Sequence, residues 1–136
     1  QKMFRRLDRQ YEKLLSNFKL RYEENPEIFE GIEAGEVFTV FERTAQIMLL
    51  FFPSRISADV TFDVSVLLQG HYGSYHVYLE TFIPKDLNQP YHSTLNIYAE
   101  KTLVFTGGGE ANEVLEKFVQ IIRPLFEKTT RLEITF

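Results

Sequence analysis

The sequence contains no cysteine and no tryptophan, and none of its apolar runs is long. Without cysteine, the chain has no disulfide framework, no thiol nucleophile and no cysteine-based zinc or iron–sulfur site. The longest apolar run, from Ile47 to Pro53, has seven residues, whereas a membrane-spanning helix needs about 18. We therefore predict a chain without a transmembrane segment, and we expect an intracellular location.

The composition is that of one folded domain. The 136 residues are 44% apolar and 25% charged, which excludes wholesale disorder and collagen-like repeats. This length suffices for a single two-layer core and is too short for two ordinary domains. The sequence opens on Gln1 and has no signal segment before it, so we expect an excised domain or a processed product.

Charge is unevenly distributed along the chain. Residues 1–22 contain seven basic and two acidic side chains, a formal charge of +5, and the remainder must carry −9 to give the net −4. Such asymmetry favours partner binding or self-association, although a solvated helix face beside an acidic loop is an equally good interpretation. The acidic remainder argues against nucleic acid as the partner, because phosphate binding needs a positive surface.

Residues 1–25 form the first predicted unit, an amphipathic helix that Pro26 ends. Its apolar residues alternate spacings of three and four, the a and d positions of a heptad pattern: Phe4, Leu7, Tyr11, Leu14 and Phe18. This stripe is either the end of a coiled coil that docks on a partner or the packed face of a helix on its own sheet. In the first case Arg5, Arg6 and Arg9 orient the partner electrostatically.

Residues 26–136 are predicted to form a single α+β domain. Strict alternation of apolar and polar residues marks a first strand, and a turn at residues 70–73 leads into its partner. The connections between the strands are too short for parallel crossovers, so the strands form an antiparallel meander. The predicted strands are residues 59–68, 74–83, 94–99 and 102–106.

Four further segments complete the predicted topology. Residues 36–52 fit one helical face, yet their β-branched and aromatic residues favour a hairpin that turns near residues 42–44. Residues 107–109, all glycine, are interpreted as a flexible connection to a C-terminal helix. That helix, residues 110–128, is expected to kink or end near Pro124, and residues 132–136 alternate like a strand. The expected architecture is a meander sheet flanked by the N-terminal amphipathic helix and a C-terminal helix.

Few residues offer reactive chemistry. Asp63, His76 and Glu80 are expected on the outward face of neighbouring strands, where such a cluster can bind a metal or move protons, but their spacing matches no ligand motif. The glycines before the C-terminal helix resemble a phosphate cradle, but Glu110 and Glu113 would repel a phosphate there. No serine lies in a nucleophile elbow. We therefore expect a non-enzymatic protein with no catalytic residue, no cofactor and no metal ligand.

The order of elements resembles that of the RWD domain, a relative of the ubiquitin-conjugating fold. The resemblance is carried by the acidic residues 23–33, the strand end at residues 82–84, the loop that closes at Pro90 and Tyr91, and residues 95–98. The Tyr-Pro pair typical of the family is missing from this loop. The resemblance implies an interaction module, in which a coiled coil can lead into the domain.

These observations predict a protein–protein interaction or assembly module, a scaffold element that binds a protein partner or forms a homodimer through its N-terminal helix. The predicted interaction residues are Phe4, Arg5, Arg6, Leu7, Arg9, Tyr11, Leu14 and Phe18. Aromatic residues make up 15% of the chain, which leaves an alternative open. They either fill a core between the sheet and the helices or line a cavity there, and in the second case the protein is a carrier of a small apolar ligand.

Overall fold

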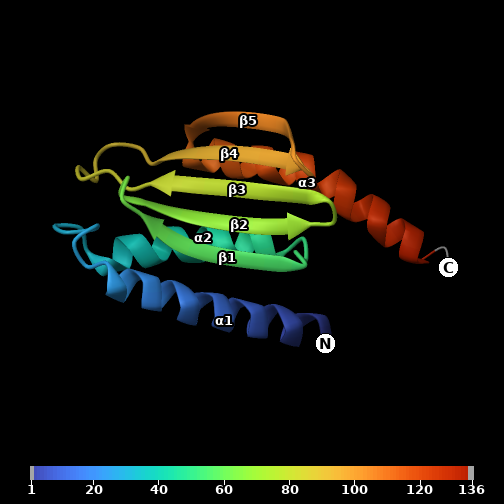
Figure 1. The fold of residues 1–136 in the computed structure, drawn as a ribbon, viewed down its shortest axis with the longest axis horizontal. Coiled ribbons are helices and arrows are strands. Elements are labelled where there is room, and N and C mark those ends of the chain that lie inside the picture. Colours follow the sequence, from blue (N-terminus) through green and yellow to red (C-terminus); the bar gives the residue numbers. More distant parts are fainter. Residues whose placement is uncertain (1, 135–136) are drawn as a thin grey trace.

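Three helices and five strands make up the fold (Figure 1). The computed structural model describes the backbone of residues 2–134 and the side chains of residues 7–127. The strands pair in the order β1–β2–β3–β4–β5, each pair antiparallel, so the predicted α+β fold with a meander sheet is confirmed. The elements are α1 (Lys2–Glu24), α2 (Ala34–Leu49), β1 (Arg55–Thr61), β2 (Ser65–Tyr72), β3 (Tyr75–Phe82), β4 (His92–Ala99), β5 (Thr102–Glu110) and α3 (Ala111–Ile134).

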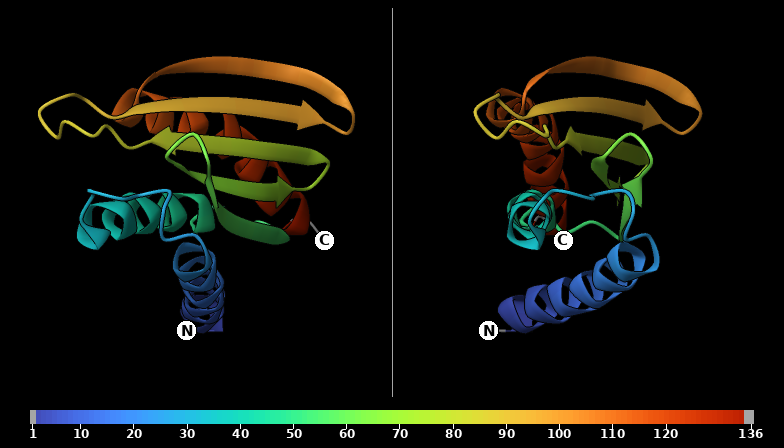
Figure 2. Two further views of the ribbon diagram at one scale, coloured as in Figure 1. Left: turned by 60° about the vertical axis from the view of Figure 1, so that its left-hand side comes forward. Right: turned by 90° about the vertical axis from the view of Figure 1, so that its left-hand side faces the viewer.

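The helices cover one face of the sheet and one of its two edges. α2 and α3 lie on the same face (Figure 2). α1 runs along β1, at the edge of the sheet, and also packs against α2 (Figure 1). Within the part of the chain that the structure describes, no helix covers the second face of the sheet or the edge formed by β5.

The core lies between the sheet and α2 and α3, and the second half of α1 contributes to it. The inward side chains of the central strands are fully buried, as are those of the helices opposite them. Phe18 of α1 stacks on Phe41 of α2, with 4.4 Å between the ring centroids. Each large side chain buried in this way contributes about 1.5–3 kcal/mol. The largest fully buried side chains are Phe18, Phe41, Met48, Leu68, Leu79, Leu95, Ile97, Phe118 and Ile122.

The prediction of a hairpin over residues 36–52 is wrong, because α2 occupies most of that segment. The buried residues of α2 recur at spacings of three and four: Val37, Val40, Phe41, Thr44, Ala45 and Met48. The preference of β-branched and aromatic residues for strands spans only about 1 kcal/mol, so burial of a whole helical face outweighs it. The hydroxyl of Thr44 donates to the Val40 carbonyl, which satisfies this polar group in the core.

The single strand predicted over residues 59–68 is two strands joined by a tight turn. Val60 at the end of β1 pairs directly with Val66 in β2, and the chain reverses over residues 62–64. The alternating pattern hides this turn, because the paired residues differ by an even number and stay on the same face. No glycine, proline or asparagine marks the reversal, and Val64 adopts the left-handed region at φ 60°.

Three other boundaries differ from the predictions. β2 extends to Tyr72, so the next reversal lies at residues 73–74. Residues 107–109 continue β5 and pair with β4, so these glycines are not a flexible connection. α3 starts directly afterwards and passes through Pro124 to Ile134 without ending there. Residues 132–134 are therefore helical, not a strand, and residues 135–136 lie outside the described residues.

Candidate functional site

The predicted interaction stripe on α1 is covered unevenly. Leu14 and Phe18 are 3% and 0% exposed, because α2 and the sheet cover them. Tyr11 is half-buried, with its ring centroid 6.1 Å from that of Phe41, and Leu7 is half-buried one turn further toward the N-terminus. The side chains of the other predicted residues in the first turns, Phe4, Arg5 and Arg6, lie outside the described residues.

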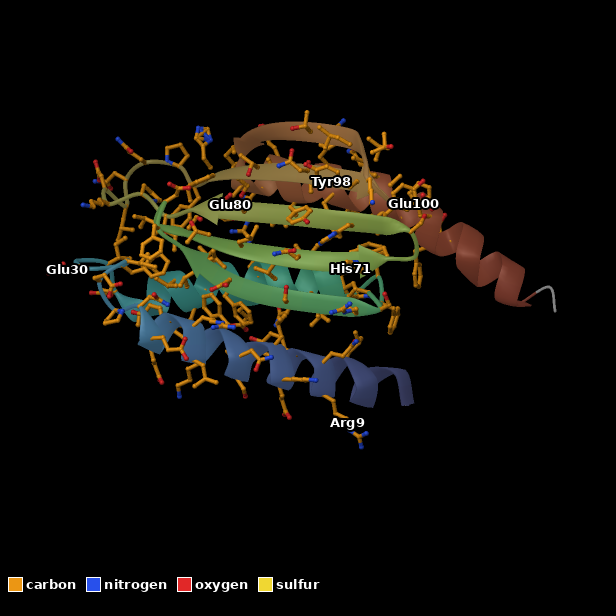
Figure 3. The ribbon with its side chains drawn as sticks, viewed as in Figure 1. Arg9, Glu30, His71, Glu80, Tyr98 and Glu100 are labelled. Carbon is orange, nitrogen blue, oxygen red and sulfur yellow. The ribbon has the colours of Figure 1, made fainter. Side chains whose placement is uncertain are left out.

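The charged side of the same helix end points away from the body of the protein. Arg9 is exposed and extends from α1 on the side opposite the sheet (Figure 3). Tyr11 faces inward, and burial together with the nearby Glu42 carboxylate raises the pKa of its phenol. The structure therefore divides the stripe into a buried half at Leu14 and Phe18, which a partner cannot reach, and a half-covered part at Leu7 and Tyr11.

The uncovered face of the sheet carries a row of stacked rings that sequence reasoning missed. His71 and His76 face each other across β2 and β3, with 3.9 Å between their ring centroids. His76 also stacks on Tyr78 at 4.2 Å, and Tyr78 meets Tyr98 edge to face at 5.6 Å. Because these rings use their faces against one another, they do not form an open platform for a planar ligand.

The cluster of Asp63, His76 and Glu80 is not assembled. Glu80 accepts a hydrogen bond from Ser65 at 2.5 Å and another from Thr61, whereas His76 bonds to Gln69. His76 and Glu80 lie four residues apart on β3, which is about 13 Å along a strand. Asp63 lies in the turn between β1 and β2. These three side chains therefore share no hydrogen-bond network. The signal that could have separated them is the turn at residues 62–64.

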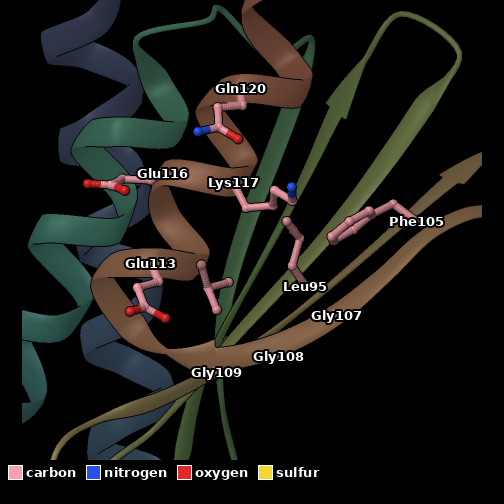
Figure 4. A pocket seen from close by; sticks show the side chains of 10 residues that line it. Leu95, Phe105, Gly107, Gly108, Gly109, Glu113, Glu116, Lys117 and Gln120 are labelled. Atoms are coloured by element: carbon pink, nitrogen blue, oxygen red, sulfur yellow. The ribbon is translucent and has the colours of Figure 1, made fainter.

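A groove lies between β5 and the first turns of α3 (Figure 4). Its volume is about 390 Å³, and its floor consists of Leu95, Phe105 and Val114. The backbone of residues 107–109 forms one wall, and the Phe105 ring lies against Gly107. Glu113, Glu116, Lys117 and Gln120 line the helical side. The groove thus joins a free strand edge to a helix that carries charges of both signs.

The space between the sheet and the helices is filled by side chains. Phe41, Met48, Leu79 and Phe118 are fully buried there, so they occupy the volume that a bound apolar ligand would need. A second depression, of about 550 Å³, lies between α2 and α3, where Ile47, Leu115 and Val119 line it. It is a surface feature and not the sheet–helix cavity that a carrier requires. The carrier interpretation therefore gains no supporting observation.

No protein-family model, no curated protein and no solved structure matches the chain. The likeness to the RWD domain therefore stays a prediction. Over the residues that the structure describes, none of the helices combines the length and the apolar character that crossing a bilayer requires. Over the same residues, no three His, Asp or Glu side chains are grouped as a metal site needs.

Proposed function

We propose that this chain is a non-enzymatic assembly module that contacts another protein through the first half of α1. The observation that carries the proposal is the graded cover of the heptad stripe. Leu14 and Phe18 anchor the helix in the core, whereas Leu7 and Tyr11 retain partly exposed apolar surface. A helix that is fixed at one end presents the other end without losing further conformational freedom on binding, which favours association.

Charge supports the same end of the helix. Arg9 is exposed on the side away from the sheet, two residues after Leu7, and the sequence adds Arg5 and Arg6 in the preceding turn. This end of the helix suits an acidic protein surface, either of a different protein or of a second copy, whose residues 23–136 carry the −9. The absence of cysteine fits an intracellular location, which belongs to the same proposal.

The test places a photo-crosslinking amino acid at position 9 and, as a matched control, at the exposed Glu30 in the connection before α2. We expect a discrete cross-linked protein from position 9 in the native host, none from position 30, and loss of the product when Leu7→Asp is added. Leu14→Asp is unsuitable, because this residue is buried and its substitution would unfold the domain. Identical products from both positions, or a product that survives Leu7→Asp, would reject the proposal.

A further inference from the structure

The two edges of the sheet differ in whether another element covers them. α1 runs along the edge formed by β1, whereas β5 pairs only with β4 and its outer edge has no neighbour among the described residues (Figure 2). A free edge presents unpaired backbone N–H and C=O groups, and soluble proteins usually block it with charges, proline or a very short strand. β5 has nine residues, no proline and only one charged residue, Glu110 at its end. Its edge is therefore open to another strand.

The two halves of β5 differ in bulk. The first half carries Leu103 and Val104, which are 46% and 51% exposed, and these are large apolar side chains without cover. A bulge places both of them opposite Tyr98 of β4, so they count as one position in the strand pairing. The second half, residues 107–109, has no side chains. A basic residue, Lys101, precedes the strand, and Glu110 ends it.

We propose that β5 pairs with β5 of a second copy of this chain, antiparallel, about a two-fold axis at Thr106. With the bulge counted as one position, Thr106 then faces the partner's Thr106, and inward and outward residues stay in phase. Leu103 and Val104 lie opposite the partner's Gly108, and Phe105 lies opposite the partner's Gly107. Lys101, in the hairpin turn before Thr102, comes near the partner's Glu110 where the pairing ends. Leu103 and Val104 thus meet a position without a side chain, whereas Gly107 is covered by the Phe105 ring of its own strand, so the two Phe105 rings must pack side by side.

This self-complementarity is what favours a second copy over a foreign peptide. Along β5, large apolar side chains come first and glycines follow, with a basic residue before the strand and an acidic residue at its end. An antiparallel second copy runs in the opposite direction, so its glycines lie beside the large side chains and its acidic end lies near the basic residue. The two Phe105 rings come onto neighbouring diagonal positions beside the axis, within reach of each other, over the groove next to α3. The two sheets join into one continuous sheet of ten strands.

The contact is small. Pairing along one strand, with the groove beside α3, lies at the low end of interface sizes, below about 1,200 Å² in total. Contacts of this size are typically weak and transient, so we expect a reversible dimer with a mass that rises with concentration in sedimentation velocity. Val104→Lys should shift the equilibrium to monomer, because a lysine on an edge strand opposes pairing with another strand and each copy would bring one lysine to the interface. Leu87→Lys in the loop between β3 and β4 is the matched control, since Leu87 is also 51% exposed.

The charge pair offers a second test. Lys101→Glu should weaken the dimer by placing a carboxylate opposite the partner's Glu110, and Lys101→Glu with Glu110→Lys should restore it. Glu110 also accepts a hydrogen bond from the Asn112 N–H at the start of α3, so thermal unfolding must accompany each variant. A charge-swapped pair that keeps the wild-type melting profile but does not recover the dimer contradicts the register.

A single cysteine tests the axis directly, because the chain has none of its own. Thr106→Cys should form a disulfide-linked dimer on mild oxidation, since directly opposed residues bring their Cβ atoms to about 5 Å. Thr102→Cys is the control, because its two copies would lie roughly 20 Å apart, six positions along the strand. A monomer at every concentration overturns the inference. A dimer that is lost with Leu7→Asp but kept with Val104→Lys overturns it as well and assigns association to α1.

Discussion

Replacing Phe18 by alanine measures whether α1 belongs to the folded core. The ring is 0% exposed, stacks on Phe41 at 4.4 Å and meets the edge of Phe38 at 5.4 Å between centroids. A Phe→Ala change at such a site removes transfer energy and leaves a cavity, and together these effects cost about 3–5 kcal/mol. Domains of this size have about 5–15 kcal/mol of stability, so the substitution removes a large share of it.

The assay is urea unfolding followed by circular dichroism, with tyrosine fluorescence as a second probe because the chain has no tryptophan. Leu20→Ala on the same helix is the control: Leu20 is 56% exposed, and alanine is a good helix former, so we expect a change within about 0.5 kcal/mol. Phe18→Leu should lose less than Phe18→Ala, which keeps the comparison usable where the alanine variant is too unstable to study.

The result that refutes the reasoning is equally specific. An unchanged midpoint for Phe18→Ala means that α1 contributes nothing to the folded core. The whole heptad stripe would then be free for a partner, including Leu14, and the division into a buried and a half-covered part would be wrong. A free energy of unfolding that falls by about 3–5 kcal/mol for Phe18→Ala, with Leu20→Ala unchanged, establishes that the second half of the helix is structural.

Two further predictions concern polar groups. Burial lowers the pKa of His76 from 6.5, with the charges of His71 and Arg55 adding to the effect, so the folded state binds fewer protons than the unfolded one below pH 6.5. The free energy of unfolding should therefore fall as the pH drops from 6.5 toward the lowered pKa, and this group should leave it level at pH values well above 6.5. The urea midpoints of His76→Gln should lack this part of the pH dependence. The Tyr72 hydroxyl donates to the Met48 carbonyl at 2.6 Å near the end of α2, so Tyr72→Phe should cost about 1–3 kcal/mol in the same unfolding assay, and no loss would show that this bond is not formed.

The sequence was informative wherever a local period coincided with burial. The alternation in β2, β3 and β4 predicted the central strands and their meander, because one face of each is buried against the helices and the other is not. The heptad spacing in α1 predicted a helix for the same reason. The buried positions of α2 also share one helical face in the sequence, but the same residues were compatible with a hairpin of two strands.

Sequence reasoning failed where neighbours in space decide the outcome. The reversal at residues 62–64 keeps the alternation in phase and contains only one typical turn residue, Asp63, which also fits the polar face of a continuous strand. The glycines of β5 read as a linker because their strand character comes only from pairing with β4. His71 and His76 stand five residues apart in the sequence, and their stacking exists only because β2 and β3 fold back on each other.

The sequence by itself determined the α+β fold class and the amphipathic first helix, because hydrophobic period and composition are local properties. Only the tertiary structure decided which apolar surface remains for other molecules. Leu14 and Leu7 have the same place in the heptad pattern, yet α2 and the sheet bury the first and leave the second half-covered. Likewise, β5 is an edge because no strand among the described residues pairs with its outer side. Burial depends on which elements meet in space, and a one-dimensional pattern does not contain that information.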